Sequence, residues 1–298
     1  MASSEEIIDL WRVPADKSIR LKDYDPEWAG DPKLPKAERK RFAEELLSQD
    51  VSALAEVQER LYAANSWSIL IILQAMDTAG KDGTIKHVMS GVNPQGCQVY
   101  SFKHPSAAEL DHNFFWRYAK ALPERGCIGI FNRSYYEEVL VVRVHSELVK
   151  AQRIPDAKID DDFWANRFAD INAFERHLTR NGTLILKFFL HISKEEQRKR
   201  LLKRLKDPKK QWKFAADDVA ERAFWDDYMK VYEEAISTTS TKWAPWYIIP
   251  ADHKWVSRSL VARIVTSSIE SLDLDYPDVT DAQRATIGEA KKQLEAEK

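Results

Sequence analysis

Residues 69–84 read Ile69-Leu-Ile-Ile-Leu-Gln-Ala-Met-Asp-Thr-Ala-Gly-Lys-Asp-Gly-Thr84. The apolar run at the start is short and rich in β-branched residues, which is typical of a strand buried on both faces. A polar Gly-Lys turn and a helix follow it. In a P-loop, this order lets backbone N–H groups and the helix start surround phosphate oxygens, while the lysine reaches the terminal phosphates. The sequence therefore predicts a phosphate-binding loop formed by Ala79, Gly80, Lys81, Gly83 and Thr84.

This loop departs from the usual pattern G-x-x-x-x-G-K-[ST] at two positions. Ala75 stands at the first glycine, and Asp82 stands at the hydroxyl residue. Without that hydroxyl, a Mg²⁺ ion needs other oxygen ligands, and Asp77 and Asp82 are the nearby carboxylates. We therefore expect both to hold Mg²⁺, with Mn²⁺ as an alternative. The pattern alone leaves open an ordinary strand-to-helix turn in which Lys81 is solvated.

The rest of the chain predicts a layered α/β fold. Four further strand-like runs follow, at Gln98–Lys103, Cys127–Phe131, Thr183–His191 and Trp246–Pro250. The stretches between them are long enough for crossover helices. Alternating strands and helices indicate three layers, a parallel five-stranded sheet with helices on both faces.

The sequence also suggests how the chain is divided. Apolar residues recur at helical spacing from Lys36 to about Ala64. We expect residues 1–65 to form an arm and a long helix packed on the core; a break near Gln49–Asp50 is left open. Residues 66–270 would form the P-loop phosphotransferase domain. Residues 271–298 would form a tail with a charged helix from about Asp281.

A second polar segment, Asn132-Arg-Ser-Tyr-Tyr-Glu-Glu138, follows the third predicted strand. Ligands of open α/β sheets bind at the carboxyl ends of strands, so this segment should face the P-loop. Arg133 is suited to clamp phosphate because a guanidinium binds two oxygens at once. Asn132 replaces the acidic residue that usually holds magnesium through water. Glu137 or Glu138 could restore that charge, although a surface role for Glu138 is equally open.

A basic block from Lys194 to Lys213 contains ten Lys and Arg residues against three acidic residues, while the whole chain has a formal net charge of −2. An anionic substrate must therefore be bound by a local cluster rather than by the charge of the molecule. The block predicts a helical lid, about residues 194–220, that closes over phosphates. A solvated helix face is the alternative. No nucleic-acid recognition motif accompanies the charge, so we expect no nucleic-acid partner.

Composition places the chain among soluble proteins. Hydrophobic residues make up 44% and charged residues 31%, and no apolar run approaches the length of a membrane span. The acidic amino terminus lacks the apolar region of a signal peptide. The two cysteines, Cys97 and Cys127, lie in apolar runs and are expected to be buried free thiols. Together these features predict a cytoplasmic protein with no membrane partner.

Several motifs together resemble the polyphosphate kinase 2 family, from Arg20-Leu-Lys-Asp-Tyr-Asp25 to about Val256. They are Met76-Asp-Thr-Ala-Gly-Lys-Asp-Gly83, Phe102-Lys-His-Pro-Ser106, Phe115-Trp-Arg117, Asn132-Arg-Ser-Tyr-Tyr136, Ser193-Lys-Glu-Glu-Gln197 and Gln211-Trp-Lys213. The resemblance implies a thymidylate-kinase-like P-loop fold and phosphoryl transfer between inorganic polyphosphate and nucleotides. Many members carry Gly-Lys-Gly-Gly and Asp-Arg-Ser-Trp-Tyr instead. Asp82, Asn132 and the segment 137–143 are similar to the class III subgroup, which phosphorylates both AMP and ADP.

The same resemblance implies roles for individual residues. Asp77 and Lys81 would be the essential P-loop pair, and Arg117 and Arg133 would hold phosphates beside it. The polyphosphate path would be lined by Lys103, Arg200, Arg204 and Lys213. The phosphate-binding set would also include Asp82, Asn132 and Glu137. A homo-oligomer, dimer or tetramer, is also implied.

The expected reaction is the reversible conversion of AMP and ADP to ADP and ATP with polyphosphate as donor. Two other functions remain as alternatives. The same P-loop and lid would serve a nucleoside monophosphate kinase that uses ATP as donor. Asn132 and the missing loop hydroxyl would also suit a protein that binds polyphosphate or nucleotide without catalysis.

Overall fold

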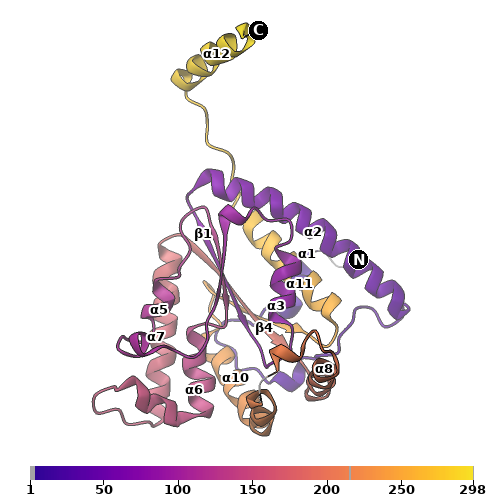
Figure 1. The fold of residues 1–298 in the computed structure, drawn as a ribbon, viewed down its shortest axis with the longest axis vertical. Coiled ribbons are helices and arrows are strands. Elements are labelled where there is room, and N and C mark those ends of the chain that lie inside the picture. The colour runs from indigo at the N-terminus through magenta and orange to yellow at the C-terminus, as the bar shows by residue number, and fades with distance from the viewer. Residues whose placement is uncertain (1–3, 215, 298) are drawn as a thin grey trace.

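The structure is a computed structural model that describes residues 4–214 and 216–297; the side chains of residues 4–7 and 213 lie outside the description. Five parallel strands form one sheet in the order β2-β3-β1-β4-β5 (Figure 1). They are β1 (Ser68–Gln74), β2 (Cys97–Ser101), β3 (Ile128–Asn132), β4 (Thr183–His191) and β5 (Trp246–Pro250). The predicted parallel five-stranded sheet is confirmed.

Strand β1 lies at the centre of the sheet because both of its faces are apolar, and all seven of its residues are buried. It pairs with β3, where Leu73 lies opposite Asn132, and with β4, where Leu73 lies opposite Phe188. Strand β2 is shorter than predicted. The Phe102 N–H still donates to the Asn132 carbonyl, but the ladder stops before Lys103 as the chain approaches Pro105.

Helices cover both faces of the sheet (Figure 1). One face carries α1 (Ser4–Trp11), α2 (Lys36–Ala64), α3 (Lys81–Val88) and α11 (Lys254–Glu270). The other carries α5 (Trp116–Ala119), α6 (Val141–Val144), α7 (Asp161–Arg180) and α10 (Trp225–Thr239). The remaining helices are α4 (Ala107–Leu110), α8 (Lys194–Lys206), α9 (Asp217–Ala220) and α12 (Asp281–Ala296). Short 3-10 turns occur at 21–23, 94–96, 135–139, 146–152, 211–213 and 221–224.

Helix α2 runs unbroken for 29 residues, so the break considered near Gln49–Asp50 does not occur. Asp50 is buried against α11, where its carboxylate lies 2.7 Å from Arg263 Nε. This ion pair compensates the charge of the carboxylate through Oδ1, and the backbone of the helix continues without a break. The helix ends at Asn65, whose left-handed backbone lets its N–H donate to the Leu61 carbonyl.

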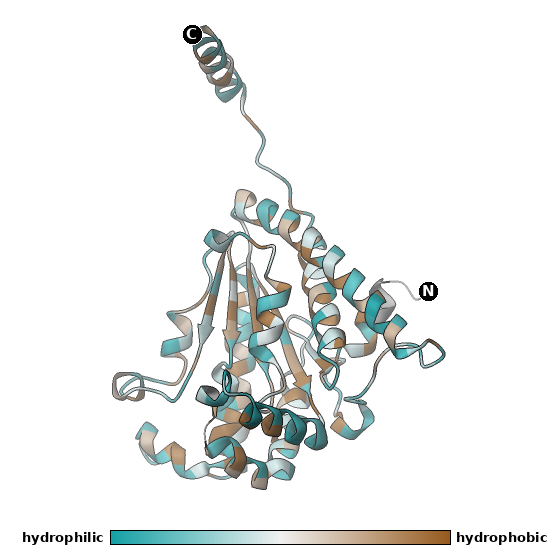
Figure 2. Ribbon diagram, turned by 45° about the vertical axis from the view of Figure 1, so that its right-hand side comes forward, coloured by the Kyte–Doolittle hydropathy of each residue, from teal (hydrophilic) through white to brown (hydrophobic). Residues whose placement is uncertain are grey.

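The C-terminal helix α12 stands apart from the rest of the molecule at the end of an extended segment (Figures 1 and 2). None of its described residues is buried, and nothing lies within 4 Å of a Cβ built on Gly288. Thr280 and Gln283 form a capping box at its start. The charged helix expected from about Asp281 is therefore present, while the domain boundaries at residues 65 and 270 stay predictions.

The two cysteines differ in how deeply they are buried. Cys127 is buried but Cys97 is only half-buried, so the expectation of two buried thiols holds for one of them. Burial raises the pKa of the Cys97 thiol to about 11.

Among the described residues, no helix combines the length and the apolar character that crossing a bilayer requires.

Candidate functional site

The P-loop lies between β1 and α3, as the sequence predicts. Gly80 adopts φ 116°, a conformation that favours glycine, and Thr78 adopts φ 63°. Helix α3 starts directly after Gly80, where the Thr84 N–H donates to the Gly80 carbonyl over 2.9 Å. Ala75 needs no left-handed backbone, which explains why the first glycine of the usual pattern can be absent here.

Lys81 points back over the loop, and its Nζ donates to the Ala75 carbonyl over 2.9 Å. Burial lowers the pKa of Lys81 and the nearby Arg133 lowers it further, while Asp77, Glu137 and Asp82 oppose that shift. The loop thus holds two cations close together beside several carboxylates. A bound phosphate would relieve the repulsion between the cations.

Arg133 joins the ends of β3 and β1. Its backbone N–H donates to the Leu73 carbonyl over 3.1 Å, and its backbone adopts φ 66°, which is uncommon for a residue other than glycine. Its Nη2 lies 3.2 Å from Asp77 Oδ1, and its Nη1 lies 3.7 Å from Glu137 Oε2. The pKa of Arg133 is raised, chiefly by Glu137. The strand-end segment therefore does face the P-loop.

The two neighbouring glutamates have different surroundings. Glu137 faces the loop; burial raises its pKa, and Arg133 and Lys81 oppose that shift. Glu138 points into the protein, where its carboxylate lies 2.9 Å from Arg167 and both side chains are buried. Of the two candidates that the sequence leaves open, only Glu137 belongs to the site.

The unusual pair Asp82 and Asn132 is in direct contact, because Asn132 Nδ2 donates to Asp82 Oδ1 over 2.9 Å. Among the described residues, no group of three or more His, Cys, Asp or Glu side chains could hold a metal ion. Mg²⁺ in phosphotransferases, however, is commonly bound by one or two carboxylates together with substrate phosphates. Asp77 and Asp82 fit that kind of site, and they do not fit a cage built from protein ligands alone.

Arg200 of α8, which the resemblance places along a polyphosphate path, contacts the backbone of the P-loop. Its Nη1 donates to the Thr78 and Ala79 carbonyls over 3.2 and 2.8 Å, and its Nη2 to those of Ala251 and Asp252 over 2.7 and 2.8 Å. Its Nε donates to Glu196 over 2.8 Å. The guanidinium therefore braces the P-loop against the end of β5. Its predicted contact with phosphate stays a prediction.

The other predicted basic residues lie farther from the loop or are engaged elsewhere. Arg117 donates to the Lys103 carbonyl over 2.8 Å and to the Tyr118 hydroxyl over 2.6 Å, and has no described contact with the P-loop. The exposed Lys103 lies just beyond β2. Arg204 lies 2.7 Å from Asp218. The side chain of Lys213 lies outside the described residues.

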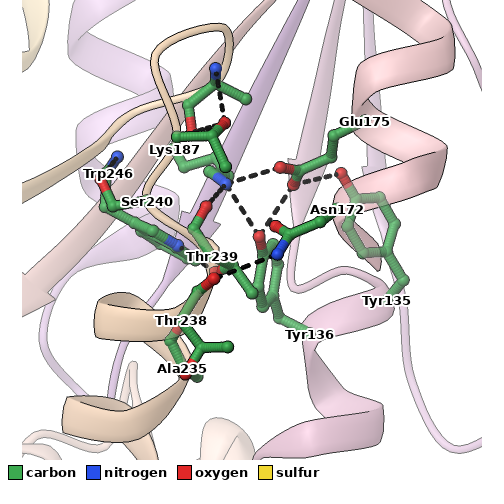
Figure 3. Close-up of polar contacts among 12 residues, drawn as sticks. Tyr135, Tyr136, Asn172, Glu175, Lys187, Ala235, Thr238, Thr239, Ser240 and Trp246 are labelled. Atoms are coloured by element: carbon green, nitrogen blue, oxygen red, sulfur yellow. Dashed lines mark hydrogen bonds and ion pairs between the residues drawn. The ribbon is translucent and has the colours of Figure 1, made fainter. Parts of the chain in front are cut away.

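A buried network that the sequence did not single out supports this site (Figure 3). Lys187 Nζ donates to Glu175 Oε2 over 2.6 Å, to the Tyr136 hydroxyl over 2.9 Å and to the Thr239 carbonyl over 2.7 Å. The Tyr135 and Tyr136 hydroxyls donate to Glu175 Oε1. The network fixes the turn that directly follows Arg133. A lone lysine in the apolar strand β4 was the signal that could have revealed it.

Comparison with known proteins agrees with this geometry. The family model described as Polyphosphate kinase 2 (PPK2) matches residues 36–277. The chain is 51% identical over 261 residues to an "ADP-polyphosphate phosphotransferase" of Rhodopseudomonas palustris, covering 87% of this chain and 90% of that protein. It is 44% identical over 277 residues to an "AMP/ADP-polyphosphate phosphotransferase" of Meiothermus ruber, covering 93% and 98%. The crystal structure of polyphosphate kinase 2 from Arthrobacter aurescens TC1 is 40% identical and superposes with a TM-score of 0.85, covering 97% and 99%.

Proposed function

The chain belongs to the polyphosphate kinase 2 family, and on that premise we propose that it transfers phosphoryl groups reversibly between inorganic polyphosphate and adenine nucleotides. The reaction converts AMP to ADP and ADP to ATP. The observation that carries the proposal is the junction of two strand ends, where Lys81 and Arg133 lie beside Asp77. The names of relatives that act on ADP, or on AMP and ADP, support both acceptors.

The side chains at this junction suit phosphoryl transfer without a general base. The attacking group is an ionised phosphate oxygen of AMP or ADP, so no proton has to be removed from it. The P-loop N–H groups and Lys81 would bind the phosphate being transferred, and Arg133 would hold its oxygens from the end of β3. Catalysis then rests on in-line positioning and on neutralising the charge of the transferring group.

Asp77 and Asp82 would hold the divalent cation, Mg²⁺ with Mn²⁺ as an alternative. When bound, the ion neutralises charge on the phosphate oxygens. Its presence would also explain why carboxylates stand beside a phosphate site. The Asn132 amide, through its bond to Asp82, would orient that carboxylate.

The remaining parts of the proposal concern assembly and location. We infer a homo-oligomer, a dimer or tetramer, because Phe42 and Leu46 leave apolar surface exposed on one side of α2. Light scattering of the purified protein measures the oligomeric state directly.

A cytoplasmic location fits a reaction whose acceptors are nucleotides. The polyphosphate path is proposed to include Lys103, Arg200, Arg204 and Lys213, and Arg117 is proposed to hold phosphates beside the P-loop.

A donor assay with ADP, long-chain polyphosphate and Mg²⁺ tests the function. The wild type should form ATP without any other phosphoryl donor. Lys81→Ala should lower kcat by about a thousandfold, which is typical when a residue that stabilises transition-state charge is removed. Lys86→Ala is the matched control, because Lys86 lies exposed on the same helix α3. A protein that only binds its ligands would show polyphosphate binding and no ATP. A monophosphate kinase would form ATP and AMP from two ADP molecules whether or not polyphosphate is present, so the ATP formed must depend on polyphosphate.

A further inference from the structure

Three cations lie together near the P-loop, and the predicted polyphosphate path did not include them. Lys254 is the first residue of α11, Arg258 follows one helical turn later, and Lys203 lies on α8. We call these three residues the α11 cation cluster. Figure 1 shows α3, α8 and α11 in the same region of the molecule.

Two contacts place this cluster against the phosphate loop. A Cβ built on Gly83, in the first turn of α3, would lie 3.3 Å from Arg258 Nη2. Arg200 bonds the Ala79 carbonyl of the loop and the Ala251 and Asp252 carbonyls just before α11. The start of α11 is therefore held beside the loop.

The cluster is electrostatically unfavourable in the protein alone. Burial lowers the pKa of Lys254, and repulsion from Arg200, Arg258 and Lys203 lowers it further. Burial and then Arg200 lower the pKa of Arg258, and Glu44 opposes that shift. Within residues 4–214 and 216–297, no ion pair is recorded for Lys203, Lys254 or Arg258. The charges are therefore poorly compensated.

The position of the cluster on its helix adds to this cost. The amino terminus of a helix carries partial positive charge and favours acidic residues. Helix α11 has no acidic residue in its first turn, and its N-cap residue His253 makes no side-chain cap hydrogen bond. Lys254 and Arg258 also form a like-charge pair at i, i+4, which destabilises a helix. A bound polyanion would remove all of these penalties at once.

We propose that the α11 cation cluster binds the distal phosphates of the polyphosphate chain, beyond the unit held in the P-loop. This inference rests on the proposed function. A nucleotide places its phosphates at the loop and presents an uncharged base beyond them, so three further cations match it poorly. A polyphosphate continues with regularly spaced charge, which cations bind as they bind a nucleic-acid backbone. Arg200, which bonds carbonyls of the loop and of the segment before α11, connects the P-loop with the start of the cluster.

The test compares chain lengths in the variant Lys254→Gln/Arg258→Gln. The KM for long-chain polyphosphate should rise about tenfold, because two screened charge contacts of about threefold each are lost. The KM for the shortest polyphosphate that the wild type uses should change less than twofold, as should the KM for ADP and kcat. The KM of the variant for long chains should also depend less on salt concentration. The control is Arg284→Gln/Lys291→Gln, which removes two positive charges from the exposed helix α12.

An equal rise in KM for long and short chains would overturn the inference, and so would no rise at all. Direct titration with labelled long-chain polyphosphate keeps this result separate from the proposed function. If the wild type bound polyphosphate but formed no ATP, the proposed function would fail while a weaker Kd in the variant still supported the cluster. Lys254→Gln alone provides the same comparison if the double variant does not fold, because it removes one charge of the cluster and leaves Arg258 in place.

Discussion

Arg133 places its guanidinium 3.2 Å from the carboxylate of Asp77, although the two residues are 56 positions apart in the sequence. The contact joins the end of β3 to the loop that follows β1. Arg133 reaches it from a left-handed backbone conformation with φ 66°. The buried Lys187–Glu175 network holds the next turn in place. Two separate sequence motifs thereby become one site.

The contact between Asn132 and Asp82 should depend on one partner being an amide. Asn132→Asp would place two carboxylates within hydrogen-bond distance, so we expect kcat/KM to fall about tenfold. The exchanged variant Asn132→Asp/Asp82→Asn restores a donor and an acceptor and should recover most of that loss. Rates with AMP and with ADP, each measured over a range of Mg²⁺ concentrations, provide the comparison. An exchanged variant no better than Asn132→Asp would argue against the pairing.

The two arginines of α8, Arg200 and Arg204, should behave differently when removed. Arg200→Ala deprives four backbone carbonyls of their donor, so the unfolding free energy should fall by about 3 kcal/mol. Arg204→Ala removes a half-buried ion pair with Asp218 and should cost less than Arg200→Ala, about 1 kcal/mol. Denaturant unfolding and the KM for polyphosphate should be measured on both. Equal stability losses would contradict the bracing role of Arg200.

The buried pair Lys187 and Glu175 should couple strongly in a double-mutant cycle. Lys187→Met leaves the Glu175 carboxylate buried without its cation, which should cost about 3–5 kcal/mol. In Lys187→Met/Glu175→Gln the residual charge is gone, so the double variant should be more stable than Lys187→Met alone. Urea unfolding of the wild type, both single variants and the double variant measures the coupling. Simple additivity would show that the pair is not interdependent.

His191, at the end of β4, should make stability depend on pH. Burial lowers its pKa to about 4, against an ordinary value of 6.5, while carbonyls of Leu21 and Tyr24 and the charge of Asp25 oppose the shift. The unfolded chain therefore takes up the proton first as pH falls from 6.5 toward 4. Unfolding free energy should fall in that window by up to about 3 kcal/mol. In equilibrium unfolding, the free energy of unfolding of His191→Gln should depend less on pH than that of the wild type. An equal dependence on pH would show that other groups cause it.

The sheet could be predicted from the sequence because its strands are apolar runs separated by helix-length segments. β4 and β5 have the predicted bounds, and β1 and β3 differ from the predicted runs by one residue at each end. The P-loop could also be predicted, since its chemistry is carried by adjacent residues. The separate surroundings of Glu137 and Glu138 could not, because Arg167, which binds Glu138, lies 29 residues further along the chain. The contacts of Arg200 could not be predicted either, because its partners are backbone carbonyls of segments that are distant in the sequence.

The most direct measurement of the central claim uses AMP as the only nucleotide and long-chain polyphosphate as the only donor, with Mg²⁺ present. The nucleotides are separated and quantified over time. We predict that ADP appears first and ATP follows, since the product of the first transfer is the acceptor of the second. Lys86→Ala should follow the wild-type course and Lys81→Ala should not. AMP that stays unchanged until ATP is added would contradict the account.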